Sequence, residues 1–142
     1  MPVKRVSPEE ALGLVEKEGY VYVDVRSIPE FEAGHPKGAY NVPWKHMDAT
    51  GYSDNEDFVA VLETAFGKDA KLVLGCKSGG RSLAAAQALI DEGFSHVVDH
   101  RAGFTGTMGP NGPEPGWGPK GLPTSEVAEE GRAYSALAPK AR

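Results

Sequence analysis

The chain has 142 residues, a formal net charge of −5 and a hydrophobic fraction of 40%, values that suit one domain with a core of its own. Its acidic balance argues against general binding to nucleic acid, which rewards clustered Lys and Arg. No apolar run approaches the roughly 18 residues of a membrane span and the start lacks a signal-peptide core, so we expect no membrane partner and a cytoplasmic protein.

Alternating helices and strands are predicted along the first half. The sequence SPEE at residues 7–10 has the form of a helix start with a capping box, and Gly19 ends that helix. Residues 20–25, YVYVDV, are β-branched or aromatic and predict a buried strand. A short helix at 29–32 and a short strand at 39–42 follow.

The same alternation continues to residue 99. Residues 54–66 are predicted to form an amphipathic helix, and 71–75, KLVLG, a short apolar strand. A helix at 82–92 and a strand at 96–99 follow. Strands that alternate with helices imply an α/β fold with a mostly parallel sheet and helices on both faces. Ligands of such sheets bind beyond the carboxyl ends of the strands.

Glycine and proline become frequent after residue 103. We predict that 103–123 is a long loop or lid rather than regular structure. The single domain is expected to span 1–124, and the tail at 125–142 to be partly helical.

Cys76, the only cysteine, comes directly after the strand at 71–75. The five residues that follow it are Lys77, Ser78, Gly79, Gly80 and Arg81. Glycines allow backbone N–H groups to turn inward, the next helix adds the positive end of its dipole, and two cations lie in the loop. This combination predicts a reactive thiolate beside an anion-binding site.

Structural interpretations compete at each position of this loop. Cys76 is alternatively an inert core cysteine, although a core cysteine needs no such loop after it. The two glycines also suit an ordinary tight turn. Arg81 either binds substrate or forms an ion pair with a carboxylate at a strand end, such as Asp24.

Metal and cofactor sites are not expected. One cysteine provides neither a disulfide within the chain nor a multi-cysteine zinc site. The four histidines follow no recognised ligand pattern.

Two motifs resemble those of the rhodanese homology domain. Residues 76–81 match the loop C-x-x-G-x-R of its single-domain members. Residues 24–43 resemble the upstream signature D-V-R-x-x-x-E-F-x-x-G-H-I-x-G-A-x-N-V-P, with Pro36 in place of Ile. Gly121-Leu122-Pro123 is similar to the family's C-terminal G-L-P, whereas 103–119 is longer than the family's segment there.

The resemblance implies a five-stranded sheet and a sulfurtransferase. Cys76 would take sulfur from a small anionic donor such as thiosulfate, or from a persulfide, and pass it as a persulfide to a thiol or cyanide. Residues 77–81 would bind the substrate through their N–H groups. The resemblance also implies that Asp24, Arg26, Glu30 and His35 form structural ion pairs and hydrogen bonds. Lys77 would hold the sulfonate of the donor, with help from Arg26, Arg101 or Lys120.

Other functions share this chemistry or this fold. A relay that passes sulfur between proteins would use Cys76 in the same way with different partners. A phosphatase of the same fold has the loop C-x5-R, one residue longer than Cys76–Arg81. A redox sensor would use the exposed thiolate alone. Phe104, Met108 and Trp117 either wall the site, selecting organic thiols, or simply close the edge of the sheet.

Overall fold

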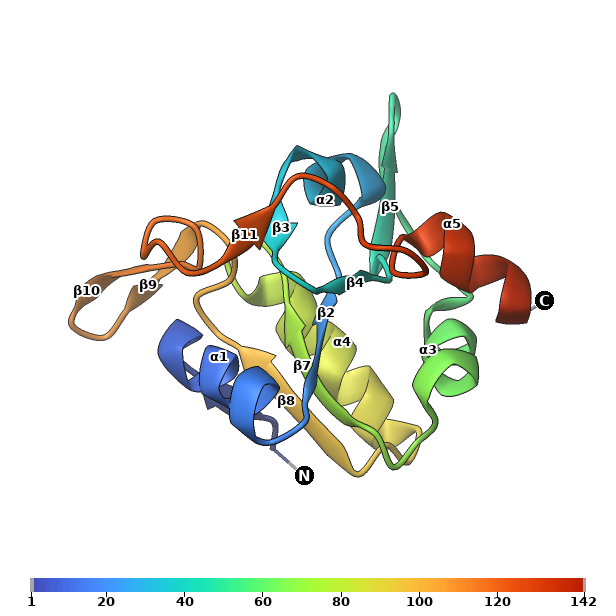
Figure 1. Ribbon diagram of the computed structural model, residues 1–142, viewed down its shortest axis with the longest axis horizontal. Helices are drawn as coiled ribbons and strands as arrows, with labels where there is room; N and C mark the ends of the chain where they lie inside the picture. The colour runs from blue at the N-terminus through green and yellow to red at the C-terminus, as the bar shows by residue number, and fades with distance from the viewer. Residues whose placement is uncertain (1, 142) are drawn as a thin grey trace.

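The computed structural model in Figure 1 describes residues 2–141. Its main sheet has five strands in the order β1-β8-β7-β2-β4, and every pair in it is parallel. These strands are β1 (Lys4–Val6), β2 (Val21–Asp24), β4 (Tyr40–Asn41), β7 (Lys71–Gly75) and β8 (His96–His100). The α/β class with helices on both faces is therefore confirmed.

Helices and three small antiparallel pairs surround the sheet. The helices are α1 (Pro8–Lys17), α2 (Ile28–Ala33), α3 (Phe58–Phe66), α4 (Gly80–Asp91), α5 (Tyr134–Leu137) and the 3-10 helix η1 (Ala138–Ala141). The pairs join β3 (His35–Pro36) to β11 (Thr124–Ser125), β5 (Lys45–Asp48) to β6 (Gly51–Asp54), and β9 (Gly106–Gly109) to β10 (Gly112–Pro115). No helix within residues 2–141 is long and apolar enough to cross a bilayer.

Strand alternation divides the core into two layers. Leu72 and Leu74 of β7 pack with α3, α4 and α5, whereas Val73 between them packs with α1 and Trp117 on the other face. Figure 1 shows α1 in front of the strands. The carboxyl ends of β2, β7 and β8 thus meet at one edge of a sheet that is covered on both sides.

The capping signals in the sequence account for the start of α1. The hydroxyl of Ser7 accepts the N–H of Glu10 at 3.1 Å, and the carboxylate of Glu10 accepts the N–H of Ser7 at 2.9 Å. This is the predicted capping box, and α1 begins directly after it.

Three predictions of local structure were wrong. The segment at 103–123 is not a loop throughout, because 106–115 forms the β9–β10 hairpin. The helix predicted at 54–66 begins at Phe58, since Asp54 closes the β5–β6 hairpin. Helix α4 begins at Gly80, two residues earlier than predicted, so its first turn includes Arg81.

Candidate active site

The loop after β7 places Cys76 at the N-terminus of α4. The residue is only 2% exposed, and its Sγ accepts the N–H of Gly79 at 3.1 Å and of Ser82 at 3.4 Å. Ser82 lies in the first turn of α4, where N–H groups have no partner within the helix. Both contacts, with the positive end of the helix, favour a negatively charged sulfur at Sγ.

The two glycines of the loop have different roles. Gly79 has φ +98°, and a Cβ there would lie 2.3 Å from the carbonyl oxygen of Arg101. Gly80 has no atom within 4 Å of such a Cβ. Gly79 is therefore required by both backbone conformation and close packing, whereas Gly80 is required by neither.

The chain after β8 anchors the outer side of the loop. The N–H of Phe104 donates to the carbonyl of Cys76 at 2.8 Å, and the N–H of Thr105 donates to that of Lys77 at 3.0 Å. The Thr105 hydroxyl adds a bond to the same carbonyl at 2.9 Å. With the carbonyls held outward, the N–H groups of Gly79 and Ser82 are aimed at the sulfur.

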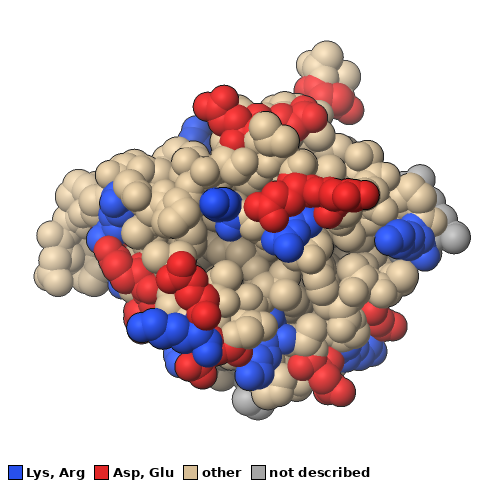
Figure 2. Space-filling model, in the orientation of Figure 1, with Lys and Arg blue, Asp and Glu red and all other residues tan. Residues whose placement is uncertain are grey.

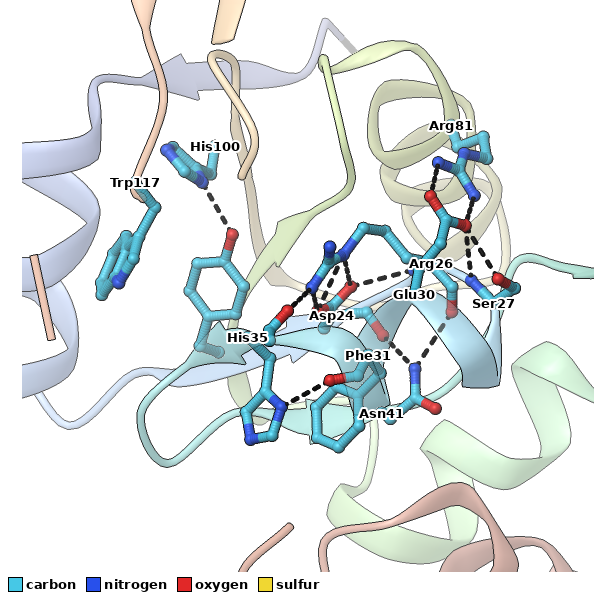
Figure 3. A network of polar contacts seen from close by, with 12 residues as sticks. Asp24, Arg26, Ser27, Glu30, Phe31, His35, Asn41, Arg81, His100 and Trp117 are labelled. Carbon is cyan, nitrogen blue, oxygen red and sulfur yellow. Dashed lines mark hydrogen bonds and ion pairs between the residues drawn. The ribbon is translucent and has the colours of Figure 1, made fainter. Parts of the chain in front are cut away.

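The upstream motif forms the network expected of it. Arg26 donates to the carboxylate of Asp24 at 2.7 Å and to the carbonyl of Gly34 at 2.6 Å. Nδ1 of His35 lies 2.7 Å from the carbonyl oxygen of Phe31, and the two rings stack. Figure 3 shows Arg26 at the centre of these contacts, so it is engaged in holding the turn after β2.

Arg81 forms an ion pair within the chain, one of the two roles considered for it, but its partner is Glu30 and not Asp24, the carboxylate that was named as an example. Its guanidinium donates to the two carboxylate oxygens of Glu30 at 2.7 and 3.0 Å (Figure 3). Asp24 is not available because Arg26, two residues away, occupies it. Burial of Glu30 opposes ionisation, but the hydrogen bonds from Arg81 and Ser27 outweigh it and lower the pKa of Glu30 to about 2.

Lys77 differs from the other cations that were expected to assist it. Arg26 is bound to Asp24. Arg101 pairs with Glu114 at 2.8 Å and Lys120 with Glu9 at 2.7 Å. Lys77 is exposed, and within residues 2–141 no carboxylate pairs with its ammonium group. It is the cation of this set that remains available to an anionic substrate.

The three apolar residues considered as a wall do not act together. Trp117 is buried against Tyr22 and His100, with ring centroids 5.4 and 5.8 Å apart, so of the two roles considered for it the structure shows packing and not the wall. The Phe104 ring lies 4.5 Å from the Arg26 guanidinium carbon. Of the three side chains, Met108 is the one that lines a cavity shared with the loop, an open cavity of about 620 Å³ that Ser78 also lines.

Sequence reasoning missed one neighbour of the loop entirely. The ring of Tyr52, on the β5–β6 hairpin, lies 5.5 Å from the guanidinium carbon of Arg81. No motif or periodicity marks Tyr52, because its position depends on how the hairpin folds back. In the described part of the chain, no group of three or more His, Cys, Asp or Glu residues is placed to hold a metal ion.

Comparison with known proteins gives a consistent match. The family model described as "Rhodanese-like domain" matches residues 7–108. The chain is 39% identical to thiosulfate sulfurtransferase 16, chloroplastic, of Arabidopsis thaliana over 75% of this chain and 80% of that one. It is 38% identical to thiosulfate sulfurtransferase GlpE of Pseudomonas putida over 71% and 81% of the two chains.

The fold has solved counterparts as well. The crystal structure of Rv0390 from M. tuberculosis superposes with a TM-score of 0.73 at 26% identity, covering 89% of this chain and all of that one. The chain spans about half the length of some other relatives, such as the senescence-associated protein DIN1 of Raphanus sativus, of which 47% is covered at 38% identity.

Proposed function

The chain belongs to the rhodanese-like domain family, and from this premise we propose that it is a sulfurtransferase that carries sulfur as a persulfide on Cys76. One observation carries the proposal. The only thiol of the chain lies at the carboxyl end of a central parallel strand, and its Sγ accepts two backbone N–H groups at the start of α4. Such a site stabilises a negatively charged sulfur without any metal or cofactor.

The first half-reaction loads the cysteine. The Cys76 thiolate attacks the outer sulfur of thiosulfate, the new Sγ–S bond forms, and sulfite leaves with the electron pair of the broken S–S bond. The N–H groups of Gly79 and Ser82 stabilise the charge on sulfur throughout. Lys77 attracts the sulfonate, because its ammonium is exposed and has no acidic partner among the residues described.

The second half-reaction returns the free thiolate. An acceptor, either a thiolate or cyanide, attacks the terminal sulfur of the persulfide. That sulfur becomes bonded to the acceptor, and the electron pair of the Sγ–S bond returns to Cys76. The products are a new persulfide or thiocyanate, so covalent catalysis divides the transfer into two steps.

Arg81 supports this chemistry by holding the loop in place through Glu30, and it does not contact the substrate. Its two terminal nitrogens both donate to Glu30, so the groups left to bind the substrate are the N–H groups of Gly79 and Ser82, which face Sγ, and the ammonium of Lys77. The Cys76–Arg81 loop has six residues, one fewer than the phosphatase loop, which favours a cradle for sulfur over one for phosphate.

Mass spectrometry of the intact protein tests the proposal. Incubation with thiosulfate should add one sulfur atom, and cyanide should remove it with formation of thiocyanate. The Cys76→Ala variant, which has no thiol left, is the control and should gain nothing. Absence of an adduct with thiosulfate and with low-molecular-weight persulfides would refute the proposal, and turnover of an aryl phosphate would favour the phosphatase instead.

A further inference from the structure

An ion pair between β1 and β8 takes no part in the reaction proposed above. Asp99, near the carboxyl end of β8, is 0% exposed, and its partner in the strand register is Arg5 of the edge strand β1. The guanidinium Nε of Arg5 donates to Oδ2 of Asp99 at 2.7 Å. Because a buried carboxylate is costly without a partner, Asp99 holds this guanidinium in a fixed position.

This ion pair differs from those at the surface around α1. In the lower left of Figure 2, where α1 lies, Lys and Arg side chains lie beside Asp and Glu side chains. The pair of Lys120 with Glu9 has side chains that are 27% and 58% exposed. Arg5 is 39% exposed, but its partner Asp99 is not, so water screens their contact less than it screens a surface pair.

The same guanidinium also reaches the Cys76 loop. Asp99 follows Val98, which packs on the α1 side of the sheet, so Asp99 and its register partner Arg5 point to the side of α4. There the Nη2 of Arg5 donates to the carbonyl oxygen of Gly79 at 3.3 Å. One side chain of the edge strand thus joins the buried carboxylate to the residue before α4.

The backbone of Gly79 depends on weak contacts for its orientation. Its carbonyl accepts three long hydrogen bonds, from Arg5, from the N–H of Leu83 at 3.2 Å and from the hydroxyl of Ser82 at 3.3 Å. Gly79 has φ +98° and no side chain, so its backbone rotates more freely than that of other residues. Such a rotation would turn its N–H away from Sγ of Cys76, to which it donates at 3.1 Å.

Asp99 also lies next to the second N–H donor of the site. Burial raises the pKa of Asp99, and the neighbouring hydroxyl of Ser82 and the guanidinium of Arg5 oppose that rise. Oδ1 of Asp99 has no hydrogen-bond partner among residues 2–141, and the Ser82 hydroxyl donates to the Gly79 carbonyl instead. The carboxylate therefore borders Gly79 through Arg5, and it borders Ser82 directly.

We propose that Arg5 and Asp99 are positioning residues of sulfur transfer: the guanidinium, fixed by the carboxylate, holds the Gly79 carbonyl outward and its N–H towards the sulfur. This inference rests on the proposed function and adds two residues that touch neither donor nor acceptor. Loss of the guanidinium should leave Lys77 in place to bind the donor. It should weaken the stabilisation of charge on sulfur, because that requires N–H groups held in position beforehand.

Single-turnover loading of the full chain with thiosulfate tests this inference. Arg5→Gln should lower the maximal rate constant about tenfold, equal to about 1.4 kcal/mol of activation free energy. The thiosulfate concentration at half-maximal rate should change by less than about twofold. Lys4→Gln is the matched control, since it removes the same charge from the exposed neighbouring position of β1. An unchanged rate constant in Arg5→Gln, or an equal loss in Lys4→Gln, would overturn the inference.

Two conservative substitutions separate position from charge. Arg5→Lys keeps the cation, but its single nitrogen cannot replace two donors that face different oxygens, so it should load at most about twofold faster than Arg5→Gln. Asp99→Asn keeps the shape and removes the charge that fixes the guanidinium, and it should slow loading about threefold. Full rescue in Arg5→Lys, or unchanged loading in Asp99→Asn, would contradict the positioning role.

Amide hydrogen exchange, followed by NMR, tests the same role without sulfur chemistry. The N–H of Gly79 should exchange about tenfold faster in Arg5→Gln, whereas that of Leu89, a buried residue of α4, should keep its rate. Unchanged exchange at Gly79, or equal acceleration at Leu89, would refute the role of Arg5. Failure of the unsubstituted protein to load sulfur from any donor would refute the proposed function and leave the exchange result standing.

Discussion

Replacing Glu30 by Gln tests how the upstream motif supports the Cys76 loop. The substitution keeps the shape and one carbonyl oxygen but removes the charge that faces Arg81. Two charge-assisted hydrogen bonds of 2.7 and 3.0 Å join these side chains, which are 19% and 18% exposed. Because solvent screens this partly exposed pair, we expect a loss of about 2 kcal/mol in the free energy of unfolding, measured by urea denaturation at pH 7.

The stability that the Glu30–Arg81 pair contributes should also depend on pH. Glu30 has its pKa lowered from 4.5 to about 2 in the folded protein, so the unfolded chain binds a proton there more readily. The stabilisation is therefore fully present above about pH 4.5 and is lost as pH falls towards 2. The difference between the unsubstituted protein and Glu30→Gln should shrink to about half between pH 6 and pH 3.

The matched control for this prediction is Glu32→Gln. Glu32 lies on the same helix but is exposed, and the hydrogen bonds around Arg81 are made by Glu30 and Ser27 instead, so we expect its substitution to change stability by less than about 0.5 kcal/mol. A difference for Glu30→Gln that stays constant down to pH 3, or equal losses from the two substitutions, would refute the role given to the Glu30–Arg81 pair.

Two further predictions concern the loop and the core behind it. Gly79→Ala should lower the free energy of unfolding by about 3 kcal/mol and remove most of the sulfur-transfer activity, because its Cβ would meet the Arg101 carbonyl at a positive φ. Gly80→Ala is the control. Equal losses for the two variants in urea denaturation would contradict the packing argument. Burial lowers the pKa of His100 from 6.5 to about 4, so the protein should lose stability as pH falls through this interval, by about 3 kcal/mol from this group. In His100→Gln, the free energy of unfolding should depend less on pH in this interval. His96→Gln, at an exposed position, is the control and should leave the dependence as it is. An unchanged pH dependence in His100→Gln would refute the role given to His100.

Elements with strong local signals were the predictable part of the fold. The capping box at Ser7 and Glu10 predicted the start of α1, and the apolar run of residues 71–75 is β7 without a change of bounds. Both signals depend on neighbours in sequence, and the tertiary structure does not oppose them. Strand alternation with helices was enough to predict the parallel sheet.

Elements that depend on distant contacts were not predictable. The β9–β10 hairpin contains the sequence GPNGPEP, whose composition is typical of a loop. It pairs nonetheless, and a Cβ on Gly116 would lie 2.5 Å from the carbonyl oxygen of Gly103, so the ends of the segment pack backbone to backbone. Glycine here serves a close approach that is visible only in three dimensions.

The ion-pair partner of Arg81 could not be predicted from the sequence for a related reason. From the sequence, Asp24 at the end of β2 and Glu30 in the helix that follows are equally available carboxylates. Asp24 is already paired, because Arg26 follows it by two residues and donates both main-chain and side-chain N–H groups to its carboxylate. Competition between two arginines for two carboxylates therefore determines the pairing, and no spacing rule describes such a competition.

The anchoring of the Cys76 loop links the N–H cradle to the β9–β10 hairpin. Phe104 and Thr105 hold the carbonyls of Cys76 and Lys77, and the β9–β10 hairpin begins directly after them at Gly106. The same segment thus holds the loop whose N–H groups face the sulfur, and it continues into the hairpin whose Met108 lines an open cavity with Ser78. The hairpin is thus joined to the cradle through Phe104 and Thr105, and the N–H groups that face Sγ depend on this anchor for their position.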